Sequence, residues 1–162
     1  MPTREKIMDA EIGIAPDAMG DLADELARCL ADTFVVYTKT LAFHWNVQGP
    51  FFQQLHAMFQ GQYEALAESI DAIAERIRAL DDMAPCSMRE LLEMASIAEQ
   101  DGVPDAMTMV RILKEDHEAI CRNLREVIKV AQDAGDEGTA NFLTDLLEGH
   151  EKTAWMLRST AS

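Results

Sequence analysis

Two histidines and two carboxylates stand at spacings that suit metal binding. His44 and His56 lie on either side of Pro50, and Asp71 and Glu75 are one helical turn apart. Imidazole nitrogens combined with carboxylate oxygens suit iron, manganese or zinc better than calcium or magnesium. An acidic pair with this spacing is also common on solvated helix faces, so ordinary surface remains an alternative.

The helix expected over residues 51–80 decides which of these groups can meet. His56, Gln60, Asp71 and Glu75 fall within a stripe about 100° wide on that helix, turned roughly 120° from its apolar face. His56 and Asp71 are about 22 Å apart along the axis, so they cannot share an ion within one chain. One antiparallel register of the helix against its own copy places His56 opposite Glu75 and Gln60 opposite Asp71. The spacing therefore predicts a site shared by two copies, which His44 joins if the segments around Pro50 form a hairpin.

The elements that position these residues are all helical. Segments 17–46, 51–80, 105–133 and 139–158 show apolar residues at a period of 3.6. Ser87 and Glu90 form a capping box that opens a short helix reaching about residue 95. The pattern predicts an all-α four-helix bundle with a short helix in the middle connection. The core stripe of the first helix is expected to be Leu22, Leu26, Leu30, Phe34, Tyr37 and Leu41.

Composition restricts the class of protein. The chain has 162 residues, a formal net charge of −15 and 48% hydrophobic residues. We expect one domain over residues 16–162 after a short N-terminal arm, residues 1–15. No apolar run has the length of a membrane span, and no signal peptide opens the sequence. The three cysteines, Cys29, Cys86 and Cys121, are odd in number and widely spaced, which suits free thiols in a reducing compartment. We therefore expect a cytoplasmic protein.

Two further histidines have no obvious chemical partner in the sequence. Neither His117 nor His150 belongs to the Glu-x-x-His pair that a di-iron site in a bundle core uses. We interpret both as surface or interface residues. Cys29 falls on the apolar side of its helix and is expected to be buried and inert.

These motifs together resemble the Dps family, the miniferritins. The resemblance covers about residues 16–160 and centres on three segments: His44-Trp45-Asn46-Val47-Gln48-Gly49-Pro50, Leu55-His56 and Asp71-Ala72-Ile73-Ala74-Glu75-Arg76-Ile77. It implies a ferritin-like fold, a shell of twelve subunits and a ferroxidase centre between two-fold-related subunits. It also implies that iron(II) is oxidised, usually by hydrogen peroxide and also by oxygen, and stored as ferric mineral under oxidative stress.

The resemblance also assigns residues. It implies that His44 and His56 of one subunit and Asp71 and Glu75 of another bind non-haem iron, with Trp45 beside them. Gln60 departs from the family, which usually has an acid there, and an amide is a weaker ligand for iron. We therefore expect one tight and one weak iron per site.

The resemblance and the charge distribution also lead to expectations about iron entry and DNA binding. The acidic pores through which iron enters the family's shells correspond most closely to Glu137 and Asp145. Some relatives bind DNA through a lysine-rich arm, but this arm offers only Arg4 and Lys6 among acidic residues, so we expect no DNA binding at physiological salt. The alternative function is a non-enzymatic helical oligomer or nucleoid-associated protein with a weakened metal site.

Overall fold

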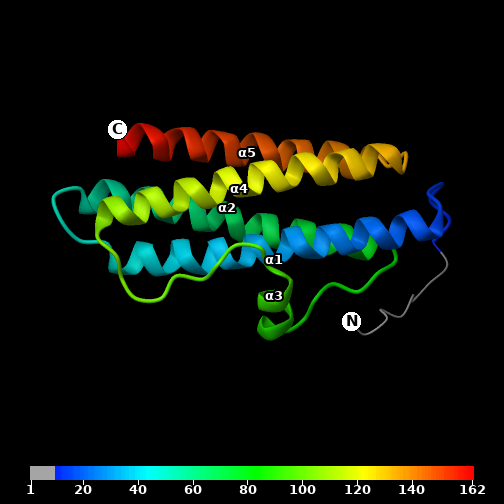
Figure 1. Ribbon diagram of the computed structural model, residues 1–162, viewed down its shortest axis with the longest axis horizontal. Helices are drawn as coiled ribbons and strands as arrows, with labels where there is room; N and C mark the ends of the chain where they lie inside the picture. Colours follow the sequence, from blue (N-terminus) through cyan, green and yellow to red (C-terminus); the bar gives the residue numbers. More distant parts are fainter. Residues whose placement is uncertain (1–9) are drawn as a thin grey trace.

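Four long helices pack side by side and a short one lies against their flank (Figure 1). The computed structural model describes residues 10–162, and the regular structure of that part is entirely helical. The helices are α1 (Pro16–Asn46), α2 (Phe52–Ala79), α3 (Met88–Met94), α4 (Ala106–Asp133) and α5 (Glu137–Ala161). The predicted all-α bundle with a short helix in the middle connection is confirmed. The proposed division into an arm and one domain stays a prediction, and residues 1–9 of the arm lie outside the described part.

The helices form two antiparallel pairs, α1 with α2 and α4 with α5, and α1 also contacts α4. The turn between α1 and α2 and the C-terminus lie at one end of the bundle (Figure 1). The long connection that contains α3 returns the chain from the far end of α2 to this end, so α2 and α4 run in the same direction. None of the helices in residues 10–162 is long and apolar enough to cross a membrane.

Local sequence signals fix the helix boundaries. Pro16 occupies the first turn of α1, where its missing N–H breaks no hydrogen bond. The Ser87 side chain accepts a hydrogen bond from the backbone N–H of Glu90, as the predicted capping box requires. Asp105 and Asp136 cap α4 and α5 in the same way. Because Asp136 is the cap, α5 begins two residues earlier than the sequence pattern indicated.

The core runs the length of the bundle but differs from the predicted stripe in the second half of α1. Leu22, Leu26 and Leu30 are buried as expected, whereas Phe34, Tyr37 and Leu41 are only partly buried. The buried face of α1 shifts there because α1 packs between α2 and α4 and must cover both. The buried residues of this half are Asp32, Thr33, Val35, Val36, Lys39, Thr40, Phe43 and His44.

A buried carboxylate holds the long connection against the bundle. Asp32 on α1 accepts hydrogen bonds from the backbone N–H groups of Ser96 and Ile97, at 2.6 and 3.0 Å. It also accepts from the Ser96 hydroxyl at 2.8 Å and the Asn123 amide at 3.1 Å. These four donors satisfy the carboxylate and tie the segment after α3 to both α1 and α4.

Candidate metal centre

The two candidate histidines are joined by reciprocal hydrogen bonds at one end of the bundle. His44 ends α1 and His56 lies in the second turn of α2, and Gly49 at φ +113° makes the turn between them. Nδ1 of His44 lies 2.8 Å from the backbone oxygen of His56, and Nδ1 of His56 lies 2.8 Å from that of His44. A carbonyl oxygen only accepts, so both Nδ1 atoms carry the proton. In the neutral imidazole each Nε2 atom then keeps a lone pair, the state in which imidazole binds a metal.

Aromatic rings hold this pair in place. The rings of His44 and His56 stack with centroids 3.8 Å apart and planes 18° apart. Tyr63 meets His44 edge-on at 5.2 Å, and Phe52 lies 5.1 Å from His56. His44 is buried and His56 half-buried, whereas the neighbouring Trp45 is 67% exposed. The two lone pairs are thus carried by rings that cannot turn freely.

The candidate carboxylates lie elsewhere on the same helix. Asp71 and Glu75 are both exposed in the C-terminal half of α2, whereas His56 lies in its second turn. Residues 10–162 of a single chain contain no group of three or more histidine, cysteine or acidic side chains arranged to hold a metal. The structure therefore brings the two histidines together and leaves the two carboxylates apart from them.

Gln60 donates a hydrogen bond to Glu64, a residue that the sequence analysis did not select. Its Nε2 donates to Oε1 of Glu64 at 2.8 Å, and both side chains are exposed. Glu64 is one turn beyond Gln60 and extends the stripe of His56. Glu64 could have been found from the sequence, because it follows Gln60 by four residues, the spacing that also separates His56 from Gln60 and Asp71 from Glu75. The stripe thus carries a carboxylate near the position where Gln60 supplies only an amide.

Comparisons with known proteins identify the family of this chain. Residues 23–162 match the family model of the ferritin-like domain. The chain is 39% identical over 134 residues to DNA protection during starvation protein 2 of Bacillus anthracis, covering 83% of this chain and 92% of that protein. The chain belongs to the Dps family of ferritin-like proteins. The sequence resemblance to this family is confirmed.

Solved structures of the family have the same fold. The Dps protein of Vibrio cholerae, described as a member of a broad superfamily of ferritin-like diiron-carboxylate proteins, superposes with a TM-score of 0.92. It is 31% identical, and the match covers 98% of this chain and 99% of that one. DpsC of Streptomyces coelicolor gives a TM-score of 0.94 at 26% identity, covering 100% of this chain and 96% of that one.

The residue after Glu75 anchors α2 to the turn before α5. Nη2 of Arg76 lies 2.9 and 3.0 Å from the two carboxylate oxygens of Asp136, and its Nε donates to Thr139 Oγ1 at 2.7 Å. Burial acts to raise the pKa of Asp136, but hydrogen bonds from Thr139 and Arg76 outweigh it and lower the pKa. Arg76 is the last charged residue of the Dps-like motif, so this ion pair fixes the position of the helix that carries Glu75.

The two pore candidates are both exposed on α5, Glu137 in its first turn and Asp145 two turns further. Asp136 lies between α4 and α5 and is buried by its pairing with Arg76, so it is not a pore residue of the same kind. The pore assignment for Glu137 and Asp145 stays a prediction.

The interpretation of His117 and His150 as surface or interface residues is wrong. They are 2% and 6% exposed, and their Nδ1 atoms lie 2.8 Å apart between α4 and α5. Burial lowers the pKa of His117 well below its ordinary value, and the neighbouring His150 lowers it further. Burial alone lowers the pKa of His150 to about 4. Each histidine lies three or four residues from buried apolar residues of its own helix, and this spacing is the signal that could have found them: Leu113 and Ile120 for His117, and Leu147 and Ala154 for His150.

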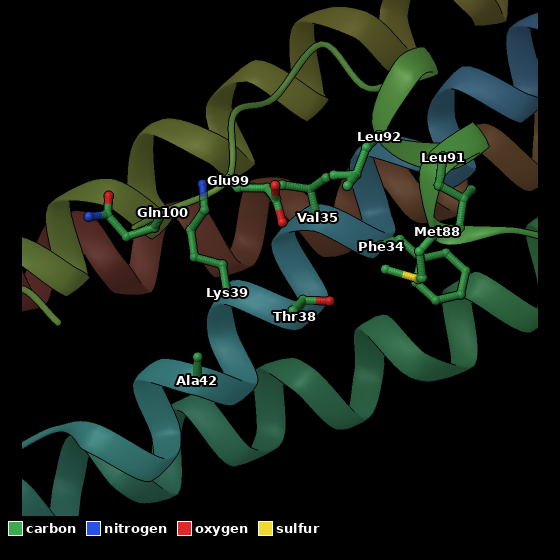
Figure 2. Close-up of a pocket in the computed structure, with 10 residues that line it drawn as sticks. All are labelled: Phe34, Val35, Thr38, Lys39, Ala42, Met88, Leu91, Leu92, Glu99 and Gln100. Atoms are coloured by element: carbon green, nitrogen blue, oxygen red, sulfur yellow. The ribbon is translucent and has the colours of Figure 1, made fainter. Parts of the chain in front are cut away.

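A surface pocket beside α3 offers no metal chemistry. It has a volume of about 80 Å³ and lies between α1, α3 and the segment that follows α3 (Figure 2). Its walls are largely apolar, and Lys39 is its buried charged group. Asp116 on α4 neutralises this charge, with Oδ2 2.7 Å from Nζ. No histidine or cysteine lines the pocket, which leaves the His44–His56 pair as the better candidate centre.

Proposed function

We propose that this protein oxidises iron(II) at a site shared between two copies and stores the ferric product inside a shell of twelve. The observation that carries the proposal is the locked His44–His56 pair, whose two Nε2 atoms have no acidic partner within residues 10–162 of the same chain. Exposed Asp71 and Glu75 supply the missing carboxylates once α2 lies antiparallel to its copy. The family membership supports iron storage and protection in general.

The chemistry follows from the ligand types. Two imidazoles and two carboxylates bind iron(II), and the negative carboxylates stabilise iron(III) still more because its charge is larger. This difference favours loss of an electron. Hydrogen peroxide and two protons accept one electron from each of two iron(II) ions and yield two water molecules. Because both electrons go to the same peroxide molecule, no hydroxyl radical is released.

Gln60 makes the two iron positions unequal. Its amide nitrogen is turned to Glu64, and its remaining oxygen carries no net charge. We expect tight binding of the first iron by His44, His56 and Glu75, and weaker binding of the second beside Gln60 and Asp71. Anaerobic titration of iron(II) into the emptied protein tests this, because it resolves two affinities. Two equal affinities per site would contradict it.

Variants test the catalytic assignment. We expect His56→Ala and Glu75→Ala to slow peroxide-dependent iron oxidation by at least about tenfold. Glu93→Gln, an exposed acid on α3, is the matched control and retains the normal rate. Gel filtration of each variant shows whether assembly persists. Unchanged oxidation in a correctly assembled Glu75→Ala protein would exclude the proposed site.

A further inference from the structure

An exposed carboxylate outside the predicted ligand set lies on the same face of α2 as the proposed iron site. At 100° per residue, Glu64 falls within the stripe that holds His56, Gln60, Asp71 and Glu75. Within residues 10–162 its side chain is exposed and has Gln60 as its hydrogen-bond partner. No cation of that part of the chain forms an ion pair with it. The charge of Glu64 is therefore available to a ligand.

The hydrogen bond to Gln60 holds this carboxylate one turn closer to the histidines. A carboxylate only accepts, so Nε2 of Gln60 faces Oε1 of Glu64, 2.8 Å away. The two residues are about 6 Å apart along the helix axis, but the bond brings the Glu64 carboxylate to the Gln60 side chain. A carboxylate has about four lone-pair sites and this bond uses one, so Glu64 can still bind a metal.

The antiparallel register of the proposed site brings Glu64 close to an acid of the second copy. The register that places Gln60 opposite Asp71 of the partner subunit places Glu64 opposite Ala67 of the partner subunit, whose small side chain leaves room. Helical side chains point toward the N-terminus of their own helix. Glu64 therefore points toward the level of Gln60, and Asp71 of the partner subunit points toward the level of Glu64. The two carboxylates converge within one helical turn.

The charge of this face calls for a cation between the two copies. Residues 56–75 contain four acidic residues and neither lysine nor arginine. Carboxylates that converge at close range repel each other, and an opposite charge within about 4–6 Å stabilises their ionised forms. An iron(II) ion between Glu64 and Asp71 of the partner subunit supplies that charge.

The histidine pair marks the site independently of these acids. His44 is 8% exposed, and its Nε2 has no hydrogen-bond partner within residues 10–162. The imidazoles of His44 and His56 belong to the first iron of the proposed site, so the second iron depends on oxygen ligands. A charged carboxylate is a better oxygen ligand for iron than the neutral amide of Gln60.

We propose that Glu64 binds the second iron together with Asp71 of the partner subunit, and that Gln60 orients Glu64. This inference rests on the proposed ferroxidase site and adds a ligand to it. The amide at position 60 then does not remove the acid from the second position but replaces it with one that lies a turn further along α2. Because this iron has no histidine ligand, its binding remains weaker than that of the first.

Anaerobic titration of iron(II) into the emptied, assembled protein tests the proposal, because it resolves the two irons. We expect Glu64→Gln to weaken binding of the second iron at least about tenfold and to leave the first unchanged. The double variant Gln60→Glu/Glu64→Gln moves the carboxylate back by one turn and should restore the second iron. Glu126→Gln is the matched control, since Glu126 is an exposed acid of α4 that also bonds a side chain of its own helix, Lys129. It should leave both affinities unchanged.

The outcomes separate this inference from the proposed function. A second-iron affinity that Glu64→Gln leaves unchanged would overturn the role of Glu64 and leave the ferroxidase site standing. If no iron binding depended on His44 and His56, both proposals would be wrong.

A zinc-soaked crystal of the natural protein adds a measurement that needs no variant. We expect a carboxylate oxygen of Glu64 at about 2.0–2.2 Å from a second zinc ion, next to the one bound by the histidines. A Glu64 carboxylate that contacts no zinc in this crystal would contradict the proposal.

Discussion

Acidification should weaken the bundle through its buried histidine pair. As pH falls, an unfolded histidine takes up a proton near its ordinary pKa of 6.5, whereas folded His150 does so only near 4. The unfolded state therefore binds more protons between these values, and the free energy of unfolding decreases as the pH decreases. At about 1.4 kcal/mol per pKa unit, His150 alone removes about 3 kcal/mol between pH 6.5 and 4. The pKa of His117 is lowered too, so protonation of His117 also decreases the free energy of unfolding as the pH falls.

Urea unfolding measured by circular dichroism from pH 8 to 4.5, at fixed protein concentration, checks this prediction. We compare the natural protein with His150→Gln, whose amide keeps a hydrogen-bonding group at the site but does not titrate. Near pH 5 the free energy of unfolding of the natural protein should fall by about 1 kcal/mol per pH unit more than that of the variant. Equal slopes in the two proteins would refute the buried neutral pair.

Three further predictions concern the candidate iron site and its support. Gln60→Asp should tighten the second iron toward the affinity of the first, as measured by anaerobic iron(II) titration. Asp71→Ala should lower the iron oxidation rate by at least about tenfold while helicity stays unchanged. Arg76→Ala leaves Asp136 without its half-buried partner, so we expect a loss of about 2 kcal/mol in the free energy of unfolding, measured by urea denaturation.

The fold was largely predictable because local and long-range signals agree. Pro16, Ser87 and Asp105 mark helix starts by rules that depend only on nearby residues. The second half of α1 was harder, because its buried face depends on contacts with both α2 and α4. A periodic pattern of apolar residues does not show that Thr33 and Thr40 are buried while Leu41 is not.

The candidate site was predictable in its residue types and only partly in its geometry. The count around Pro50 placed His44 level with His56, and the structure shows them in contact. Reciprocal hydrogen bonds to backbone oxygens follow from the turn geometry, which no spacing rule supplies. The pairing of His117 with His150 requires knowledge of how α4 packs on α5.

A crystal structure of the assembled protein soaked with zinc tests the central claim most directly. The account predicts zinc bound by Nε2 of His44 and His56 from one copy and by carboxylate oxygens of Asp71 and Glu75 from another, across antiparallel α2 helices. Zinc bound away from these residues, or held by ligands from one copy alone, would contradict it.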